Sequence, residues 1–440
     1  MNILVIGQAT LHWGRLEFGN IGNFYIIEPF FQELHRVFPD AAISTTFQLS
    51  EGFCKRERLR VIPMGYYYAW GEDNLKNALH ELSCAYIYSR TGHLPRSTPY
   101  LETVLQHDLI IDLSGDMWGD NADFLGEDRF LVGLIKDRVP QLLGKPTVML
   151  AGSPGPFHKQ ATIPFAQEVF EHFDLVTNRE PISTELLSSM GFDTSRVRDC
   201  ACPSFLFKPA PAEELERLNV GIRTERSDRP NVGFIICGWN FLQGPFDRWP
   251  REDDEYSPYV HAIDFLTHTL HVNVYLMSHA NGFPLPPAEF KLIHGRDFPI
   301  VKQLHTIVQS KGMADNVFLL DGVYDPHVTK AIIAQFDMLI SGRIHGAIAG
   351  LSQNVPTVII DYGHGPKAHK LRGFARLMQV EEYVADPADE TDLVHKISSC
   401  WSKRELIKKH LENHIPLLQD SARENFNILR ELYGKHEHPG

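Results

Sequence analysis

Arginine, lysine and histidine residues are concentrated in one short stretch of the chain. Between residues 343 and 372 the sequence places Arg343, His345, His364, Lys367, His369, Lys370 and Arg372. Arginine and lysine can hold the phosphate and carboxylate groups of a ligand, and a histidine can transfer protons near neutral pH. This stretch therefore predicts a site that binds an anion and moves protons. Cationic side chains can neutralise the anion by themselves, so the chemistry demands no metal or other cofactor.

Two buried strands and a helix should position these side chains. An apolar run at 338–340 ends in Ser341 and Gly342, a helical pattern covers 344–352, and a second apolar run covers 356–360. The turn from the first strand into the helix lies beside unpaired backbone N–H groups and the positive end of the helix dipole, where anions bind. Gly342 would let the backbone approach a ligand closely. In an open parallel sheet, such strand ends form the ligand crevice.

Strand and helix patterns alternate through most of the 440 residues. Strands are predicted at 1–7, 109–113, 146–150, 175–177, 232–237, 272–277 and 317–320, and helices at 24–38, 130–143, 182–190, 261–271, 304–310 and 327–336. This alternation is typical of α/β domains with parallel sheets. The chain is also too long for one ordinary core, so we expect two domains.

The predicted division of the chain follows its composition. An N-terminal domain covers 1–208, and residues 209–230 have the Pro, Glu and Arg content and the weak periodicity of a linker. A second domain covers 231–391, and a mostly helical segment, 392–440, should pack back onto the domains.

Composition excludes several classes of protein. The net charge of −13 argues against a partner that is a nucleic acid or an anionic membrane, although a local cationic cluster can still bind a small anion. No apolar run approaches the roughly 18 to 20 residues that span a bilayer, so we expect no transmembrane segment and a cytoplasmic protein. The six cysteines are scattered and are expected to be reduced, and the close pair Cys200 and Cys202 favours structural use over zinc binding. The oligomeric state cannot be predicted.

Four further residues are candidates for a site. Arg179 stands just before a helix that begins with Pro181, where a structural salt bridge is the competing interpretation. Asp116 and His279 each follow a predicted strand. Asn20 lies in the motif Gly-Asn-Ile-Gly-Asn, which lacks the spacing of a dinucleotide fingerprint and is either a plain glycine turn or a ligand contact.

These motifs together resemble those of the polysaccharide pyruvyl transferases. The resemblance rests on D-x4-SGRIHG-x2-A-x-L-x3-VPTVIIDY at 337–362, HK-x-RGF at 369–374, VTNREPIS at 176–183 and the early GNIGN. Only 337–374 is specific, although the resemblance extends thinly over most of the chain. It implies two Rossmann-like domains that face each other across a cleft, as in the two-domain (GT-B) glycosyltransferases, here with a helical C-terminal extension.

The resemblance also implies an activity and roles for the residues. Family members transfer pyruvate from phosphoenolpyruvate to a sugar, usually as a cyclic ketal, so the implied partners are phosphoenolpyruvate and a glycan or glycolipid precursor. The motifs assign catalysis to His345 and Arg179, and donor binding to Arg343, Lys370 and Gly342, with Lys367 competing with Lys370 for the phosphate. His279, Asn20 and Asp116 are candidates for cleft or acceptor contacts.

The chain departs from the family motifs at two places, and two other functions are alternatives to a pyruvyl transferase. Many members carry Asp-Pro where this chain has Cys202-Pro203, and the first-domain glycine loop is SGDMWGDN here, which leaves the acceptor side less certain than the donor side. A glycosyltransferase that uses a nucleotide sugar would place two glutamates on one helix; Glu382 and Glu390 have the spacing, but Pro387 should break that helix. An inactive carbohydrate-binding homologue is the other alternative.

Overall fold

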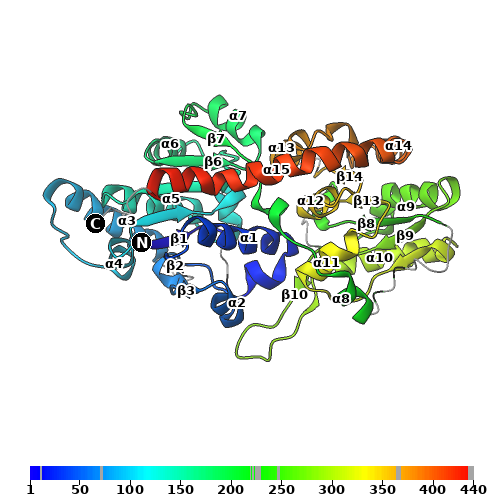
Figure 1. Ribbon diagram of the computed structural model, residues 1–440, viewed down its shortest axis with the longest axis horizontal. Coiled ribbons are helices and arrows are strands. Elements are labelled where there is room, and N and C mark those ends of the chain that lie inside the picture. The colour runs from blue at the N-terminus through cyan, green and yellow to red at the C-terminus, as the bar shows by residue number, and fades with distance from the viewer. Residues whose placement is uncertain are drawn as a thin grey trace. The chain divides into compact units, whose positions relative to one another are not determined.

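The computed structural model describes residues 1–9, 12–69, 73–218, 220, 222, 229–244, 248–362 and 368–434. These residues form two compact units (Figure 1). Unit 1 consists of Met1–Leu16, Glu28–Cys202 and the chain from Ser421 onward, and unit 2 consists of Glu17–Ile27 and Pro203–Asp420.

Unit 1 is built on a seven-stranded parallel sheet with the order β3-β2-β1-β4-β5-β6-β7. The strands are β1 (Asn2–Ile6), β2 (Ala42–Thr45), β3 (Leu59–Val61), β4 (Leu109–Asp112), β5 (Thr147–Gly152), β6 (Leu175–Asn178) and β7 (Val197–Asp199). The inner strands are apolar almost throughout because helices cover both faces of such a sheet. The strand order reverses between β1 and β4, which is the position where ligands bind in open α/β sheets.

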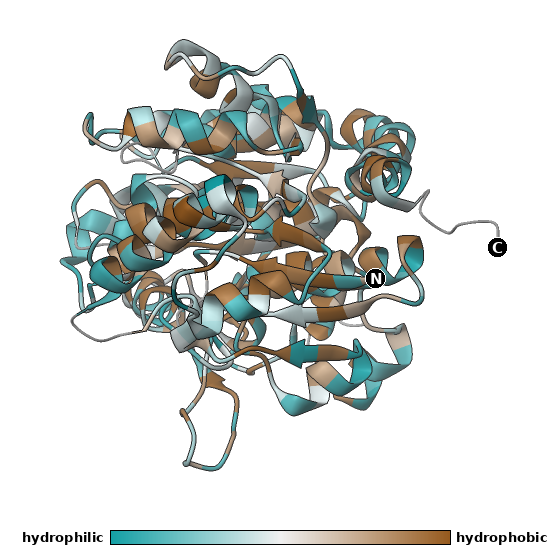
Figure 2. Cartoon of the chain, turned by 90° about the vertical axis from the view of Figure 1, so that its left-hand side faces the viewer, coloured by the Kyte–Doolittle hydropathy of each residue, from teal (hydrophilic) through white to brown (hydrophobic). Residues whose placement is uncertain are grey.

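Helices alternate with the strands of unit 1. They are α2 (Glu51–Arg56), α3 (Asn74–Thr91), α4 (Pro99–Leu105), α5 (Arg129–Leu142), α6 (Ile163–Glu171) and α7 (Pro181–Ser189), with the later part of α1 (Ile21–Val37) and the end of α15 (Arg404–Tyr433). One core cluster joins β1 and β4 to α3, α4 and α5, and a second surrounds the buried Trp118. In Figure 2 the strands are largely apolar, whereas the helices mix polar and apolar residues, as the amphipathic patterns require.

Unit 2 repeats this architecture with a six-stranded parallel sheet of order β12-β9-β8-β13-β14-β15. Its strands are β8 (Asn231–Ile235), β9 (Asn273–Leu276), β12 (Val317–Leu319), β13 (Met338–Ser341), β14 (Thr357–Ile360) and β15 (Val384–Ala385). A short antiparallel pair, β10 (Asn281–Gly282) and β11 (Ile293–His294), follows β9. The helices are α8 (Ala212–Arg217), α9 (Ser257–Asp264), α10 (Phe298–Ser310), α11 (Pro326–Ile333), α12 (Ile344–Leu351), α13 (Ala368–Leu377), α14 (Glu390–Ser402) and most of α15.

The predicted fold class is confirmed: both units are Rossmann-like, and α14 and α15 form a helical C-terminal extension. The two units do not have the boundaries that the composition predicts, however. The segment 17–27 belongs to unit 2, the end of α15 belongs to unit 1, and the expected linker 209–230 contains α8. Segment 17–27 contacts residues more than 180 positions away, among them Phe207, Ala280 and His345, which no local pattern reveals.

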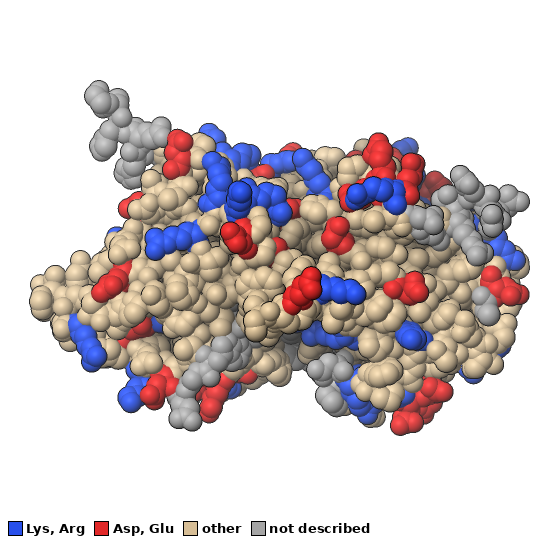
Figure 3. Space-filling view, turned by 90° about the horizontal axis from the view of Figure 1, so that it is seen from below, with Lys and Arg blue, Asp and Glu red and all other residues tan. Residues whose placement is uncertain are grey.

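Charges on the surface are mixed in sign. In the view of Figure 3, lysine and arginine side chains are interspersed with aspartate and glutamate. Among the helices of the described residues, none combines the length and the apolar composition needed to cross a bilayer.

Candidate functional site

The turn from β13 into α12 holds Arg343 and His345 in the positions that the sequence predicts. The Ser341 hydroxyl accepts a hydrogen bond from the Arg343 N–H at 3.2 Å and donates one to the Arg343 carbonyl at 2.8 Å. These bonds hold the Arg343 backbone at the position just before α12. His345 lies in the first turn of this helix. Both side chains are largely buried. The N-terminus of α12 supplies backbone N–H groups and a positive dipole end beside them.

A buried carboxylate holds the Arg343 guanidinium. Arg343 Nε lies 2.9 Å from Asp297 Oδ2, and Nη2 lies 2.5 Å from Asp297 Oδ1, so the pair is bidentate. Burial opposes the charged form of Arg343, but the Asp297 carboxylate outweighs it and holds the pKa of the guanidinium above its ordinary value. Asp297 precedes α10 and carries no sequence signal of this role. Since two of the three guanidinium nitrogens contact Asp297, Nη1 is the nitrogen best placed to bind a ligand.

A second arginine adds positive charge to this cluster. Arg296 is exposed and adjoins Asp297 in the sequence, and the positive charge of Arg343 is the main cause that lowers its pKa. Arg343 pairs with Asp297, and both charges act on Arg296, so these three groups together carry a net positive charge. This excess can attract an anionic ligand.

His279, a predicted candidate, lies in the same unit. It follows β9 and is fully buried, and among the described residues neither ring nitrogen has a hydrogen-bond partner. Burial, and then the charge of Arg343, lower the pKa of His279 to about 3. Its surroundings therefore favour the neutral form of this histidine.

The Gly-Asn-Ile-Gly-Asn motif packs against both histidine segments. The Asn20 backbone pairs with Ala280, next to His279, in an isolated antiparallel bridge. A Cβ atom on Gly22 would lie 2.6 Å from the Cβ and 2.7 Å from the Nδ1 of His345. Glycine at this position therefore has a packing reason, and a role of Asn20 in ligand binding stays a prediction.

Asn240 joins the ends of two neighbouring strands. Its side-chain amide donates to the carbonyl oxygens of Gly342 and Ile360, both at 3.3 Å, and its Oδ1 accepts the Cys237 N–H at 2.9 Å. A Cβ atom on Gly342 would lie 1.9 Å from that Oδ1. Packing against Asn240 thus already requires glycine at 342, and its donor-binding role stays a prediction.

The second cationic loop leads into α13. Asp361, just after β14, accepts a hydrogen bond from Arg372 Nε at 2.9 Å and forms an ion pair with Nη2 at 2.8 Å. The ring of Phe374 lies 6.2 Å from that of His345, so α13 adjoins the turn before α12. Lys370 lies on α13 and is largely buried. Lys367 falls outside the described residues.

In unit 1 the structure brings Arg179 and Asp116 together at the carboxyl ends of β6 and β4. Arg179 is buried; its Nε donates to Ser153 Oγ at 3.0 Å, and its Nη2 lies 3.7 Å from Asp116 Oδ1. Gly115 adopts a positive φ of 60°, and a Cβ there would lie 3.2 Å from Nη2, so glycine makes room for the guanidinium. Glu180 caps α7 by accepting the Ser183 N–H, and burial raises its pKa to about 7.

Glu382 and Glu390, the pair that a glycosyltransferase would place on one helix, do not share a helix. Glu382 lies in a 3-10 turn at 381–383, whereas Glu390 begins α14. The predicted interruption around Pro387 is confirmed.

Comparison with known families identifies the chain. The sequence model of one family, described as polysaccharide pyruvyl transferase, matches residues 20–364. The chain belongs to the polysaccharide pyruvyl transferase family. The match includes Arg179, His279 and His345, and membership makes the protein a transferase that acts on polysaccharides.

Relatives and solved structures agree with this family and fold. The amylovoran biosynthesis protein AmsJ of Erwinia amylovora is 21% identical over 431 residues, which cover 93% of this chain and 94% of AmsJ. The structure of Anabaena Alr3699/HepE in complex with UDP superposes with a TM-score of 0.58 at 13% identity, covering 99% and 100% of the two chains. The UDP-GlcNAc 2-epimerase of Neisseria meningitidis gives 0.53 at 10% identity, covering 98% and 100%. At these identities the structures establish the fold alone.

Proposed function

We propose that the protein transfers the pyruvyl group of phosphoenolpyruvate to a sugar of a polysaccharide or glycolipid precursor, as a cyclic ketal. The observation that carries this proposal is the cluster of Arg343, Arg296 and His345 at the start of α12. Phosphoenolpyruvate holds a carboxylate and a phosphate close together, and the cluster offers two guanidinium groups, helix N–H groups and a titratable side chain within one unit.

The proposed reaction removes two protons from the sugar hydroxyls and delivers one to carbon and one to the released phosphate. His345 protonates the methylene carbon, which becomes the methyl group, and the positive charge develops on the carbon that bears the phosphate. One sugar hydroxyl attacks this carbon, and a second replaces the phosphate to close the ring. The two hydroxyl protons balance the proton given to carbon and the proton taken up by the released phosphate. Arg343 Nη1, Arg296 and Lys370 stabilise the phosphate as it leaves.

The remaining residues predicted from the family motifs enter as separate proposals. Arg179, beside Asp116 in unit 1, serves the same reaction, and Lys367 shares the phosphate contact of Lys370. His279, neutral and buried, shapes the donor site and does not transfer protons. Asn20 and Asp116 are proposed to contact the acceptor.

Ligand-dependent unfolding tests the proposal. We expect phosphoenolpyruvate to raise the Tm of the wild-type protein, and we expect His345→Ala or Arg296→Gln to abolish the shift. His268→Ala is the matched control, since His268 is an exposed histidine of the same unit. In the presence of saccharide acceptors, we expect phosphate release from the wild type and His268→Ala, and none from His345→Ala or Arg296→Gln. A Tm shift with UDP-glucose and none with phosphoenolpyruvate would favour the glycosyltransferase alternative, and no response to either would favour the inactive homologue.

A further inference from the structure

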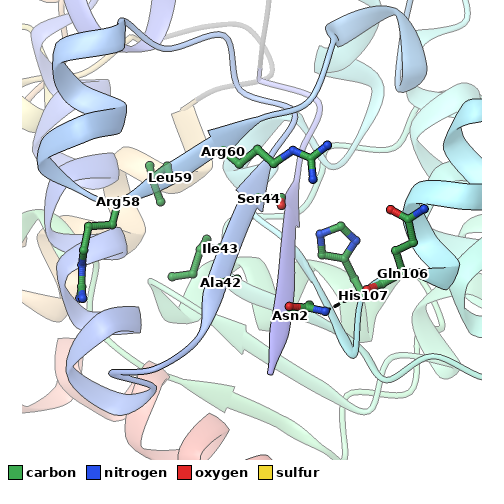
Figure 4. Close-up of a pocket in the computed structure, with 9 residues that line it drawn as sticks. All are labelled: Asn2, Ala42, Ile43, Ser44, Arg58, Leu59, Arg60, Gln106 and His107. Atoms are coloured by element: carbon green, nitrogen blue, oxygen red, sulfur yellow. Dashed lines mark hydrogen bonds between the residues drawn. The ribbon is translucent and has the colours of Figure 1, made fainter.

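Unit 1 contains a cavity at the edge of its sheet opposite to Arg179 and Asp116. The cavity has a volume of about 560 Å³ and lies at the amino ends of β1, β2 and β3 (Figure 4). Its lining residues are Asn2, Ala42, Ile43, Ser44, Arg58, Leu59, Arg60, Gln106 and His107. Arg179 and Asp116 follow the carboxyl ends of their strands, so this cavity is separate from them.

The register of the sheet brings two polar side chains of the cavity onto one face. Ser44 pairs with Arg60 between β2 and β3, and partners in a parallel pair project to the same side. Leu4 of β1 pairs with Ser44 and packs in the core cluster that includes α4. His107 comes two positions after the end of α4, a helix that covers the sheet face carrying Ser44 and Arg60. Its side chain therefore reaches the cavity from the helical layer.

The His107 ring is fixed in one orientation. His107 is largely buried, and its Nδ1 lies 2.6 Å from the carbonyl oxygen of Thr103, so Nδ1 carries the proton and donates it. The other nitrogen, Nε2, is then an acceptor that can receive a hydrogen bond from a ligand hydroxyl. In Figure 4 the Arg60 guanidinium and the Gln106 amide lie around this ring.

Positive charge dominates around the cavity. The side chain of Arg60 has no hydrogen bond or ion pair within the part of the chain that the structure describes. Burial lowers the pKa of His107, the Thr103 carbonyl opposes this change, and the charge of Arg60 lowers the pKa further. The neighbouring carboxylate, Asp108, accepts the Asn2 N–H at 2.7 Å. An unpaired guanidinium beside an acceptor nitrogen and a serine hydroxyl suits a ligand that carries both an oxyanion and hydroxyl groups.

We propose that this cavity binds a small phosphorylated sugar or polyol, whose phosphate contacts Arg60 and whose hydroxyls contact His107 and Ser44. The volume is in the range of small-molecule sites, about 300 to 1,000 Å³. The cavity is distinct from the proposed donor site of unit 2, so this inference does not depend on the proposed reaction.

Hydrogen–deuterium exchange can localise the ligand. The full-length protein is compared with and without glucose 6-phosphate, inorganic phosphate and glucose, used separately. We expect glucose 6-phosphate to slow exchange in the segments 42–46, 57–62 and 103–109, with a smaller effect of phosphate and none of glucose. Arg60→Gln should reduce the affinity at least about tenfold, as loss of a charge-assisted pair does. Arg90→Gln is the matched control, because it removes the same charge from an exposed arginine of α3 in the same unit that does not line the cavity.

The outcomes separate the two proposals. Protection in the wild type and in Arg90→Gln, but not in Arg60→Gln, supports the site. Equal protection in Arg60→Gln, or no protection of these segments in the wild type, overturns it. Protection confined to segments around residues 296 and 343–345 also overturns it, while it would support anion binding at the donor site. Circular dichroism verifies that the exposed substitution at Arg60 leaves the fold intact.

Discussion

Gly22 packs directly against the His345 side chain, although more than 300 positions separate the two residues in the sequence. Because a Cβ at position 22 would lie 2.6 Å from the His345 Cβ, any larger residue must displace the histidine or the helix that carries it. The contact explains why a glycine motif near the N-terminus accompanies the histidine motif in this family member.

Gly22→Ala should therefore lower both the transferase activity and the stability of the protein. We expect a loss of at least about tenfold in kcat, and a decrease of about 1–3 kcal/mol in the free energy of unfolding from overpacking. Gly52→Ala is the control, because a Cβ there would meet only Ser50 Oγ at 3.9 Å. Steady-state kinetics and urea unfolding measure the two effects. Normal kcat in Gly22→Ala would show that His345 tolerates displacement.

Asp297→Asn should strongly destabilise the protein. It leaves the buried Arg343 charge without its counter-ion, and breaking such a pair costs about 3–5 kcal/mol. Replacing both partners, as Asp297→Asn with Arg343→Met, should restore part of the unfolding free energy. Urea denaturation of the single and double variants measures the coupling energy between Asp297 and Arg343. Equal stability of Asp297→Asn and wild type would mean that solvent screens the pair.

Asn240 and Gly342 should show energetic coupling. Gly342→Ala places a methyl group 1.9 Å from the Asn240 amide oxygen, while Asn240→Ala removes three hydrogen bonds and opens space. We expect the double variant to be at least about 1 kcal/mol more stable than the sum of the single effects predicts. A double-mutant cycle of unfolding free energies tests this expectation, and additive effects would contradict it.

Lys330 should make stability depend on pH in the alkaline range. Burial lowers the pKa of Lys330 from 10.5 to about 7, and its ammonium group contacts the Phe207 carbonyl. Between those values the unfolded chain binds more protons than the folded chain, so the free energy of unfolding rises with pH from about 7 to about 10.5. The slope contributed by this group approaches about 1.4 kcal/mol per pH unit.

Lys330→Met isolates this effect. The difference in unfolding free energy between wild type and Lys330→Met should change in favour of the wild type as pH rises through that window. Lys302→Met, which alters an exposed lysine of the same unit, should leave the pH profile as in the wild type. A pH-independent difference for Lys330→Met would show that Lys330 is charged in the folded protein throughout.

The sequence predicted those parts of the site that local patterns encode. The turn that carries Arg343 and His345 was predictable because an apolar run, a glycine and a helical pattern are consecutive in the chain. The sequence also placed Arg179 and Asp116 each after a strand, but it did not predict that the two side chains meet. Asp297 and Asn240 were not predictable, because their partners lie 46 and 102 residues away and each depends on how loops meet in space.

The division of the chain determines how the protein can be dissected. Because residues 17–27 belong to unit 2 and the end of α15 belongs to unit 1, the polypeptide changes unit at four points: after Leu16, Ile27, Cys202 and Asp420. A fragment cut at residues 203 and 420 would lose the strand partner of Ala280 and the glycine surface beneath His345. Neither unit is thus a contiguous piece that can be expressed alone, and the N-terminal peptide would have to be supplied in trans or by circular permutation.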